Sequence, residues 1–210
     1  MKSLDKLILK AIYISNLDPS KSFLRYLQEK YQLDTSFFES RIRGLVDLGL
    51  IGKINHERYK LNSLGRETMK VVLVGGVFDI LHPGHLHTLK AAKSYGDVLV
   101  VVVARSSTAL KINKSRIIYH DEMQRKELVS SIRCVDIAMV GFEGTLYKTV
   151  EYVKPDIIAL GYDQAHGEKE IALNCRKRGL NVQVVRLNTP IPRIKSSSLK
   201  QELGSSIYDI

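Results

Sequence analysis

The chain has 210 residues, of which 44% are hydrophobic and 26% are charged. This composition is typical of a globular protein and excludes a chain that is disordered throughout. The formal net charge of +10 at pH 7 favours acidic partners, such as nucleic acids, nucleotides or phosphorylated metabolites.

Two features argue against a secreted or membrane protein. The central apolar run 98–104 is far shorter than the ~20 residues of a bilayer span, and the N-terminus lacks the apolar core and cleavage site of an export signal. Cys134 and Cys175 have no Cys or His partner at metal-binding spacing, so we expect reduced core thiols rather than a bridge. We therefore expect a cytoplasmic protein with no membrane partner.

Residues 1–68 predict a small helical domain. Apolar residues recur at three- and four-residue intervals between 4 and 14, which predicts a first helix. Asp18 followed by Pro19 predicts the N-cap and the first position of a second helix. Asp34 is expected to cap a third helix that has one apolar side.

Two short strand-like runs, 50–54 and 59–61, flank a polar stretch and complete this domain. Three helices followed by a two-stranded wing resemble a winged helix-turn-helix domain. Arg41 and Arg43 on the third helix offer contacts to DNA phosphates or guanine edges. Winged helices also serve as dimerisation modules, so DNA binding and dimerisation both stay open at this point.

Residues 69–210 alternate between strands and helices. Apolar, β-branched runs predict strands that are buried on both faces of a parallel sheet, at Val71–Val74, Val98–Val103, Ile137–Val140, Ile157–Leu160 and Val182–Val185. Helical segments are expected near 84–95, 121–132, 145–153 and 168–178. The pattern predicts an α/β fold, a doubly wound Rossmann-like parallel sheet, preceded by the winged-helix domain.

The segment 75–85, Gly-Gly-Val-Phe-Asp-Ile-Leu-His-Pro-Gly-His, follows the first of these strands and opens the next helix. Ligands of open α/β sheets bind at this kind of strand-to-helix turn. Gly76 lets the backbone approach a nucleotide closely, and Gly84 removes a side chain that would collide with a phosphate. Pro83 suits the first turn of a helix because its φ is fixed and it has no amide hydrogen.

His82 and His85 are three residues apart and should project to one side of the helix start. Two imidazoles at the positive end of a helix can donate hydrogen bonds to phosphate oxygens. They can also stabilise the charge that develops when an α-phosphate is attacked. The alternative is a capped helix with two incidental surface histidines. Against that alternative, several positions within ten residues match one pattern: Gly76, Phe78, Asp79, His82, Gly84 and His85.

That pattern, Gly-x-Phe-Asp-x-x-His-x-Gly-His, resembles the signature of the cytidylyltransferase-like nucleotidyltransferases. The resemblance covers residues 70–203. It implies that His82 and His85 contact the nucleotide phosphates and stabilise the transition state of nucleotidyl transfer. It also places the rest of the turn against the nucleotide, at Gly76, Val77, Phe78, Pro83 and Gly84.

The resemblance implies further contacts in two loops. Lys111, Lys114 and Arg116, in a loop after the second strand, take the place of a basic residue that grips substrate phosphates; we assign catalytic roles to Lys114 and Arg116. The alternative is a solvated basic loop. Glu122 and Arg125 lie in a segment like the Glu-Gln-Arg start of a family helix, although they could equally form a local ion pair.

Nucleotide contacts are also implied after the fourth strand and near the C-terminus. Asp163 would position the ribose or base, and Ser196, Ser197 and Ser198 would hold the β- and γ-phosphates at a helix start. All four residues could instead be simple helix caps. Lys195 departs from the family pattern, which has a small hydroxyl residue there.

The segments 78–85, 102–105, 154–164 and 179–182 resemble most the archaeal FAD synthases, which transfer AMP from ATP to FMN. No dedicated metal ligands are evident, so we expect Mg²⁺ to be held mainly by triphosphate oxygens and water. A cytidylyltransferase that uses CTP and glycerol 3-phosphate or another small phosphate ester is an alternative. Another is a DNA-binding regulator with a nucleotide- or flavin-sensing domain. We expect a homodimer.

Overall fold

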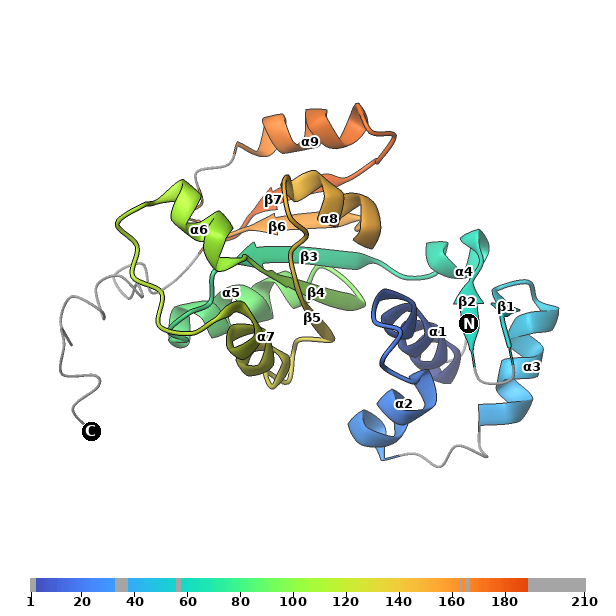
Figure 1. Cartoon of the computed structure of the whole chain (residues 1–210). Helices are drawn as coiled ribbons and strands as arrows, with labels where there is room; N and C mark the ends of the chain where they lie inside the picture. Colours follow the sequence, from blue (N-terminus) through green and yellow to red (C-terminus); the bar gives the residue numbers. More distant parts are fainter. Residues whose placement is uncertain (1–2, 33–37, 56–57, 163, 165–166, 189–210) are drawn as a thin grey trace. The chain divides into compact units, whose positions relative to one another are not determined.

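The computed structural model describes residues 3–32, 38–55, 58–162, 164 and 167–188. The chain divides into two compact units, Met1–Lys70 and Val71–Ile210. Each unit has its own secondary structure (Figure 1) and is described by itself.

The first unit combines helices with a small antiparallel hairpin. Its elements are α1 (Ser3–Leu17), α2 (Phe23–Tyr31), α3 (Glu39–Asp47), β1 (Ile51–Lys53), β2 (Tyr59–Leu61) and α4 (Ser63–Glu67). In the hairpin, Gly52 pairs with Lys60. α3 buries Ile42 and Leu45 on its inner side. The three expected helices and the two strands are present, and α4 is an additional helix. α3 begins at Glu39, after Phe38, and the predicted cap Asp34 lies outside the described residues.

The predicted start of the second helix is wrong. α2 begins at Phe23, after Ser22, rather than at Pro19. The carboxylate of Asp18 accepts hydrogen bonds from the amide of Ser20 at 3.2 Å and from its hydroxyl at 2.6 Å. An Asp side chain that bonds two residues ahead stabilises a local turn instead of a helix.

The second unit is built around a five-stranded parallel sheet with the strand order β5-β4-β3-β6-β7. The strands are β3 (Val71–Gly76), β4 (Val98–Val103), β5 (Ile137–Val140), β6 (Ile157–Leu160) and β7 (Gln183–Arg186). β4 is buried along its whole length, as expected of a strand covered on both faces. All five predicted strands are confirmed, the last with a shift of one residue.

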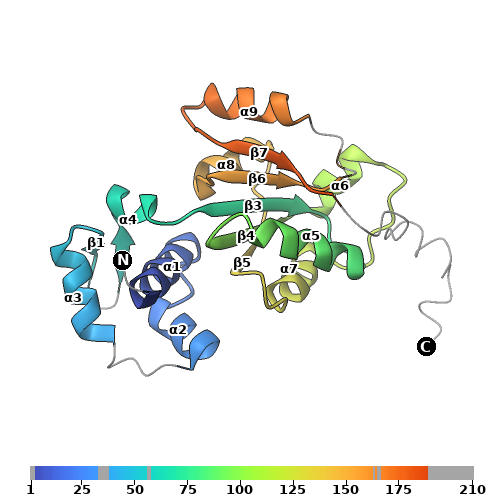
Figure 2. The same cartoon turned by 180° about the vertical axis from the view of Figure 1, so that it is seen from behind.

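Helices cover both faces of this sheet. The helices of this unit are α5 (Pro83–Lys93), α6 (Ser106–Ile112), α7 (Glu122–Ser130), α8 (Leu146–Val153) and α9 (Glu168–Arg176). α5 and α7 lie on one face, and α8 and α9 on the other (Figures 1 and 2). The predicted doubly wound α/β fold is confirmed. One correction concerns Lys111, which lies in α6 and not in a loop.

The strand order places a switch point beside β3. The chain runs from β3 outward to β4 and β5, and then returns to the other side of β3 as β6. Ligands of such sheets bind where the strand order reverses, beyond the carboxyl ends of the strands. This is the end at which β3 passes into α5.

Cys134 is half-buried, Cys175 is buried, and neither thiol is in a disulfide, as predicted. Within the described ranges, every helix is too short or too polar to cross a membrane.

Candidate active site

The turn between β3 and α5 brings two imidazoles together. His82 is the N-cap residue of α5, with extended backbone angles, and Pro83 occupies the first turn. The ring centroids of His82 and His85 are 3.9 Å apart, and the ring planes are inclined by 35°. The predicted placement on one side of the helix start is therefore confirmed.

Phe78 holds this turn in a strained conformation. Its φ is +53°, a left-handed value that bulky residues rarely adopt and that is often found at functional sites. The ring is buried, and it packs against the His85 ring with centroids 5.3 Å apart. A Cβ atom at Gly76 would lie only 2.7 Å from this ring. Gly76 is therefore needed so that Phe78 can reach His85.

His85 is kept neutral and lacks a protein partner at one nitrogen. Burial, followed by the charge of nearby His82, lowers the pKa of His85 to about 4. The Nδ1 atom is buried and has no hydrogen-bond partner among the described residues. Because buried polar atoms are nearly always paired, this nitrogen is suited to a ligand.

Asp79 braces the turn from behind. Its buried carboxylate accepts hydrogen bonds from the backbone amides of Tyr119, at 3.0 Å, and His120, at 2.9 Å. The same carboxylate lies 3.1 Å from Nδ1 of His120. Asp79 thus ties the histidine turn to the segment that precedes α7. The sequence motif identifies Asp79, but it does not reveal His120 as its partner.

Arg125 binds backbone carbonyls at the same end of the sheet, and its side chain lies in the protein interior. Its side chain is completely buried and donates to the carbonyls of Val77 (2.7 Å), Ala104 (2.8 Å) and His120 (2.9 Å). It also donates to the hydroxyl of Ser106 at 3.0 Å. One guanidinium therefore joins the ends of β3 and β4 to α6 and to the segment before α7.

The local ion pair that was the alternative role of Arg125 and Glu122 is present at 3.7 Å. It is a minor part of the arrangement, because the Glu122 carboxylate also accepts from the hydroxyl of Ser106 at 2.8 Å. Asp121 caps α7, and Gln124 completes a capping box. The Glu-Gln-Arg segment does open a helix, as predicted.

The loop after β6 is held against the end of β3. The side-chain amide of Gln164 donates to the carbonyl of Gly75 at 2.6 Å. Arg186 donates to the carbonyls of Gly161 and Gln164, at 3.0 and 2.9 Å, and pairs with Glu168 at 2.5 Å. This pairing lowers the pKa of Glu168 to about 2. Sequence reasoning did not identify Gln164 or Arg186.

The other predicted site residues are not joined to the histidine turn. Lys114 is exposed and Arg116 is half-buried, and neither side chain has a hydrogen bond to the turn within the described ranges. Four further residues lie outside the described part of the chain: Asp163, Ser196, Ser197 and Ser198. Their roles stay predictions.

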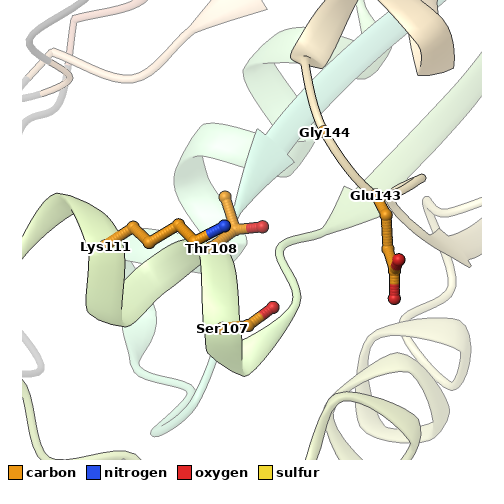
Figure 3. A pocket seen from close by; sticks show the side chains of 5 residues that line it. All are labelled: Ser107, Thr108, Lys111, Glu143 and Gly144. Carbon is orange, nitrogen blue, oxygen red and sulfur yellow. The ribbon is translucent and has the colours of Figure 1, made fainter.

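A polar pocket of about 310 Å³ lies beyond the ends of β4 and β5. Ser107, Thr108 and Lys111 line it from α6, and Glu143 and Gly144 line it from the loop after β5 (Figure 3). The pocket offers two hydroxyls, an ammonium group and a carboxylate. It lies on the β4 side of β3, whereas Gln164 and Arg186 lie on the β6 side.

The described residues contain no cluster of three or more His, Cys, Asp or Glu side chains that could hold a metal ion. The carboxylate of Asp79 already accepts from two amides and faces the His120 ring. The described side chains therefore do not form a metal cage of their own.

Gly76→Ala should destabilise the protein and lower its activity. The new methyl group would lie 2.7 Å from the buried Phe78 ring, so the ring has to shift away from His85. Overpacking of this kind costs about 1–3 kcal/mol, measurable by urea unfolding. Gly75→Ala is the matched control, because its methyl group would meet only the Val102 carbonyl, at 4.0 Å. Equal effects of the two substitutions would contradict this account.

Comparisons with known proteins bear on the same region. The Cytidylyltransferase-like family model matches residues 73–202. The FAD synthase of Picrophilus torridus is 48% identical over 127 residues, which are 60% of this chain and 90% of that protein. The FAD synthase of Aciduliprofundum boonei is 53% identical over 116 residues, which are 55% of this chain and 76% of that protein.

A solved structure has the same fold. The lipopolysaccharide core biosynthesis protein of Thermoplasma volcanium is 50% identical, covers 58% of this chain and 98% of its own, and has a TM-score of 0.55. The 127 matched residues make up 90% of the Picrophilus torridus protein. That protein is therefore too short to contain an equivalent of Met1–Lys70 in addition to the matched domain. The parallel sheet with its histidine turn and the family-model match over most of the second unit lead to the same conclusion. The chain belongs to the cytidylyltransferase-like family of nucleotidyltransferases.

Proposed function

We propose that this chain is an FAD synthase, which transfers AMP from ATP to the phosphate of FMN and releases pyrophosphate. The observation that carries the proposal is the pair His82 and His85 at the start of α5, in a domain about half identical to FAD synthases. The unpartnered Nδ1 of His85, at the switch point of the sheet, supports a ligand there.

The reaction needs little from the protein beyond positioning and charge stabilisation. An oxygen of the FMN phosphate attacks the α-phosphorus of ATP, the bond from that phosphorus to the bridging oxygen breaks, and pyrophosphate leaves. The attacking oxygen is already anionic near pH 7, so no Ser, Cys or Asp nucleophile is required. Imidazoles and amides at the start of α5 are suited to stabilising the charge on the α-phosphate.

We assign the nucleotide to the turn and to the β6 side of the site. Gly76, Val77, Phe78, Pro83 and Gly84 would line the nucleotide, with His82 and His85 at the phosphates. The hydrogen bonds of Gln164 and Arg186 support this side, because they hold the loop after β6 in place.

We assign the acceptor to the β4 side of the site. The pocket lined by Ser107, Thr108 and Lys111 offers hydroxyl groups and a positive charge to a phosphorylated polyol such as the side chain of FMN. Lys114 and Arg116 follow α6 in the chain and would add positive charge near the phosphates.

Mg²⁺ would be bound by triphosphate oxygens and water, which fits a site without a cluster of ligating side chains among the described residues. The need for ATP supports a cytoplasmic location. A homodimer is supported by two features of one edge of the sheet. β5 is an edge strand, and the exposed ring of Phe142, which follows it, packs on Tyr152 with ring centroids 5.1 Å apart.

DNA binding by the first unit is a second proposed function. Arg43 is exposed on α3, and Lys53 and Lys60 are exposed on the hairpin. Arg41 is less suited to this role than expected, because its guanidinium is bonded to the buried carboxylate of Asp5. Binding to duplex DNA that weakens steeply with salt would support this function, and binding unchanged by salt would contradict it.

The test of the main proposal is a matrix of nucleotides and acceptors scored by pyrophosphate release. We expect turnover with ATP and FMN, and none when riboflavin, which has no phosphate, replaces FMN. CTP with glycerol 3-phosphate is the competing pair. Turnover of that pair without turnover of ATP and FMN would overturn the proposal.

A further inference from the structure

His120 belongs to the edge of the site but has no part in the mechanism described so far. Its side chain is 41% exposed, whereas the Asp79 carboxylate beside it is 3% exposed. The backbone amide and Nδ1 of His120 both face Oδ1 of Asp79, at 2.9 and 3.1 Å. The carboxylate accepts from Nδ1, so the hydrogen is assigned to that nitrogen. The other ring nitrogen, Nε2, has no hydrogen-bond partner among the described residues.

The backbone contacts place His120 on the acceptor side of the turn. Arg125 holds the carbonyl of His120 together with those of Val77, after β3, and Ala104, after β4. Figure 1 shows the connection from α6 to α7 passing the carboxyl ends of the strands. His120 therefore lies near the ends of β3 and β4. It is on the side of the sheet where α6 lines the polar pocket, and away from the loop after β6.

We propose that His120 is a third imidazole of the active site and that its Nε2 atom binds the phosphate of the acceptor. This proposal rests on the proposed function. The nearby carboxylates of Asp121 and Glu122 accept from Met123 and Ser106, so Asp79 is the acidic group that faces the ring. When a phosphate dianion binds, the ring lies between two anions and is stabilised as an imidazolium that donates to both. In this role His120 holds the attacking phosphate, while His82 and His85 contact oxygens of the phosphate that is attacked.

The proposal is tested by comparing FMN with riboflavin, since the two flavins differ only in the phosphate. Binding is followed by flavin fluorescence in the presence of a non-hydrolysable ATP analogue. The wild-type protein should bind FMN more tightly than riboflavin. His120→Ala should weaken the binding of FMN about tenfold, as expected for loss of a charge-assisted hydrogen bond. Riboflavin binding should change less than twofold. In steady-state assays, KM for FMN should rise by a similar factor while KM for ATP stays within twofold.

Two variants keep the result interpretable. His120→Gln retains an amide donor without the charge, so its loss of FMN affinity should be smaller, and it serves as the main variant if His120→Ala does not fold. His87→Ala removes another imidazole, from α5, and should leave both flavins unchanged.

An equal loss of affinity for both flavins, or a raised KM for ATP alone, would overturn the role of His120. Unchanged FMN binding, or a wild-type enzyme that forms FAD but binds both flavins equally, would also overturn it. A wild-type protein that forms no FAD from ATP and FMN would instead remove the proposed function.

Discussion

His85→Ala should lower kcat for adenylyl transfer at least a hundredfold. The ring is held by Phe78 and carries a buried nitrogen that is suited to a ligand. Removing one preorganised donor to a developing negative charge costs about 2.7–4 kcal/mol of transition-state stabilisation. Burial and the charge of His82 lower the pKa of this ring to about 4 in the protein without nucleotide, and a directed hydrogen bond from the ring would stabilise the charge on the α-phosphate.

The same substitution should leave folding stability unchanged or slightly increased. His85 buries a polar nitrogen without a partner in the described structure, which is a cost to folding that function can justify. Urea unfolding and pyrophosphate release measured on the same sample separate the two effects. His87→Ala, on the same helix, is the matched control and should retain nearly full turnover. A folded His85→Ala protein with near-normal kcat would remove His85 from the mechanism.

Arg125→Met should destabilise the protein more than Gly76→Ala does. The methionine keeps an unbranched apolar chain but leaves the carbonyls of Val77, Ala104 and His120 without their buried donor. Leaving a buried acceptor without its donor costs about 1–3 kcal/mol for each group, so the loss at three carbonyls is a large part of the free energy of unfolding of an ordinary domain. We expect a large fall in the urea midpoint.

Activity should fall together with stability, since Arg125 joins the histidine turn to the segment of His120. Lys126→Met provides a control on the same helix. Lys126 is only half-buried, and substitutions at surface sites usually change stability by less than about 0.5 kcal/mol. If Arg125→Met and Lys126→Met unfold at the same urea concentration, the buried guanidinium does not hold this edge together.

The strands of the second unit could be predicted because their signal is local. A strand covered on both faces needs a continuous apolar, β-branched run, and β4 has one from Val98 to Val103. The turn from β3 to α5 is also local, since Pro83 marks the helix start and the spacing of His82 and His85 equals about one turn. Local rules failed at Asp18, whose side chain was free to bond Ser20 instead of capping a helix.

By itself, the sequence determined the α/β class, the five strands and the paired imidazoles at the start of α5, because each depends on residues within one element or one turn. Only the tertiary structure decided what surrounds that pair. The contacts of Asp79 with His120, of Arg125 with Val77 and of Gln164 with Gly75 join residues 41, 48 and 89 positions apart. Contacts over such separations arise when the sheet brings the ends of its strands to one edge, and no local pattern of residue types records them.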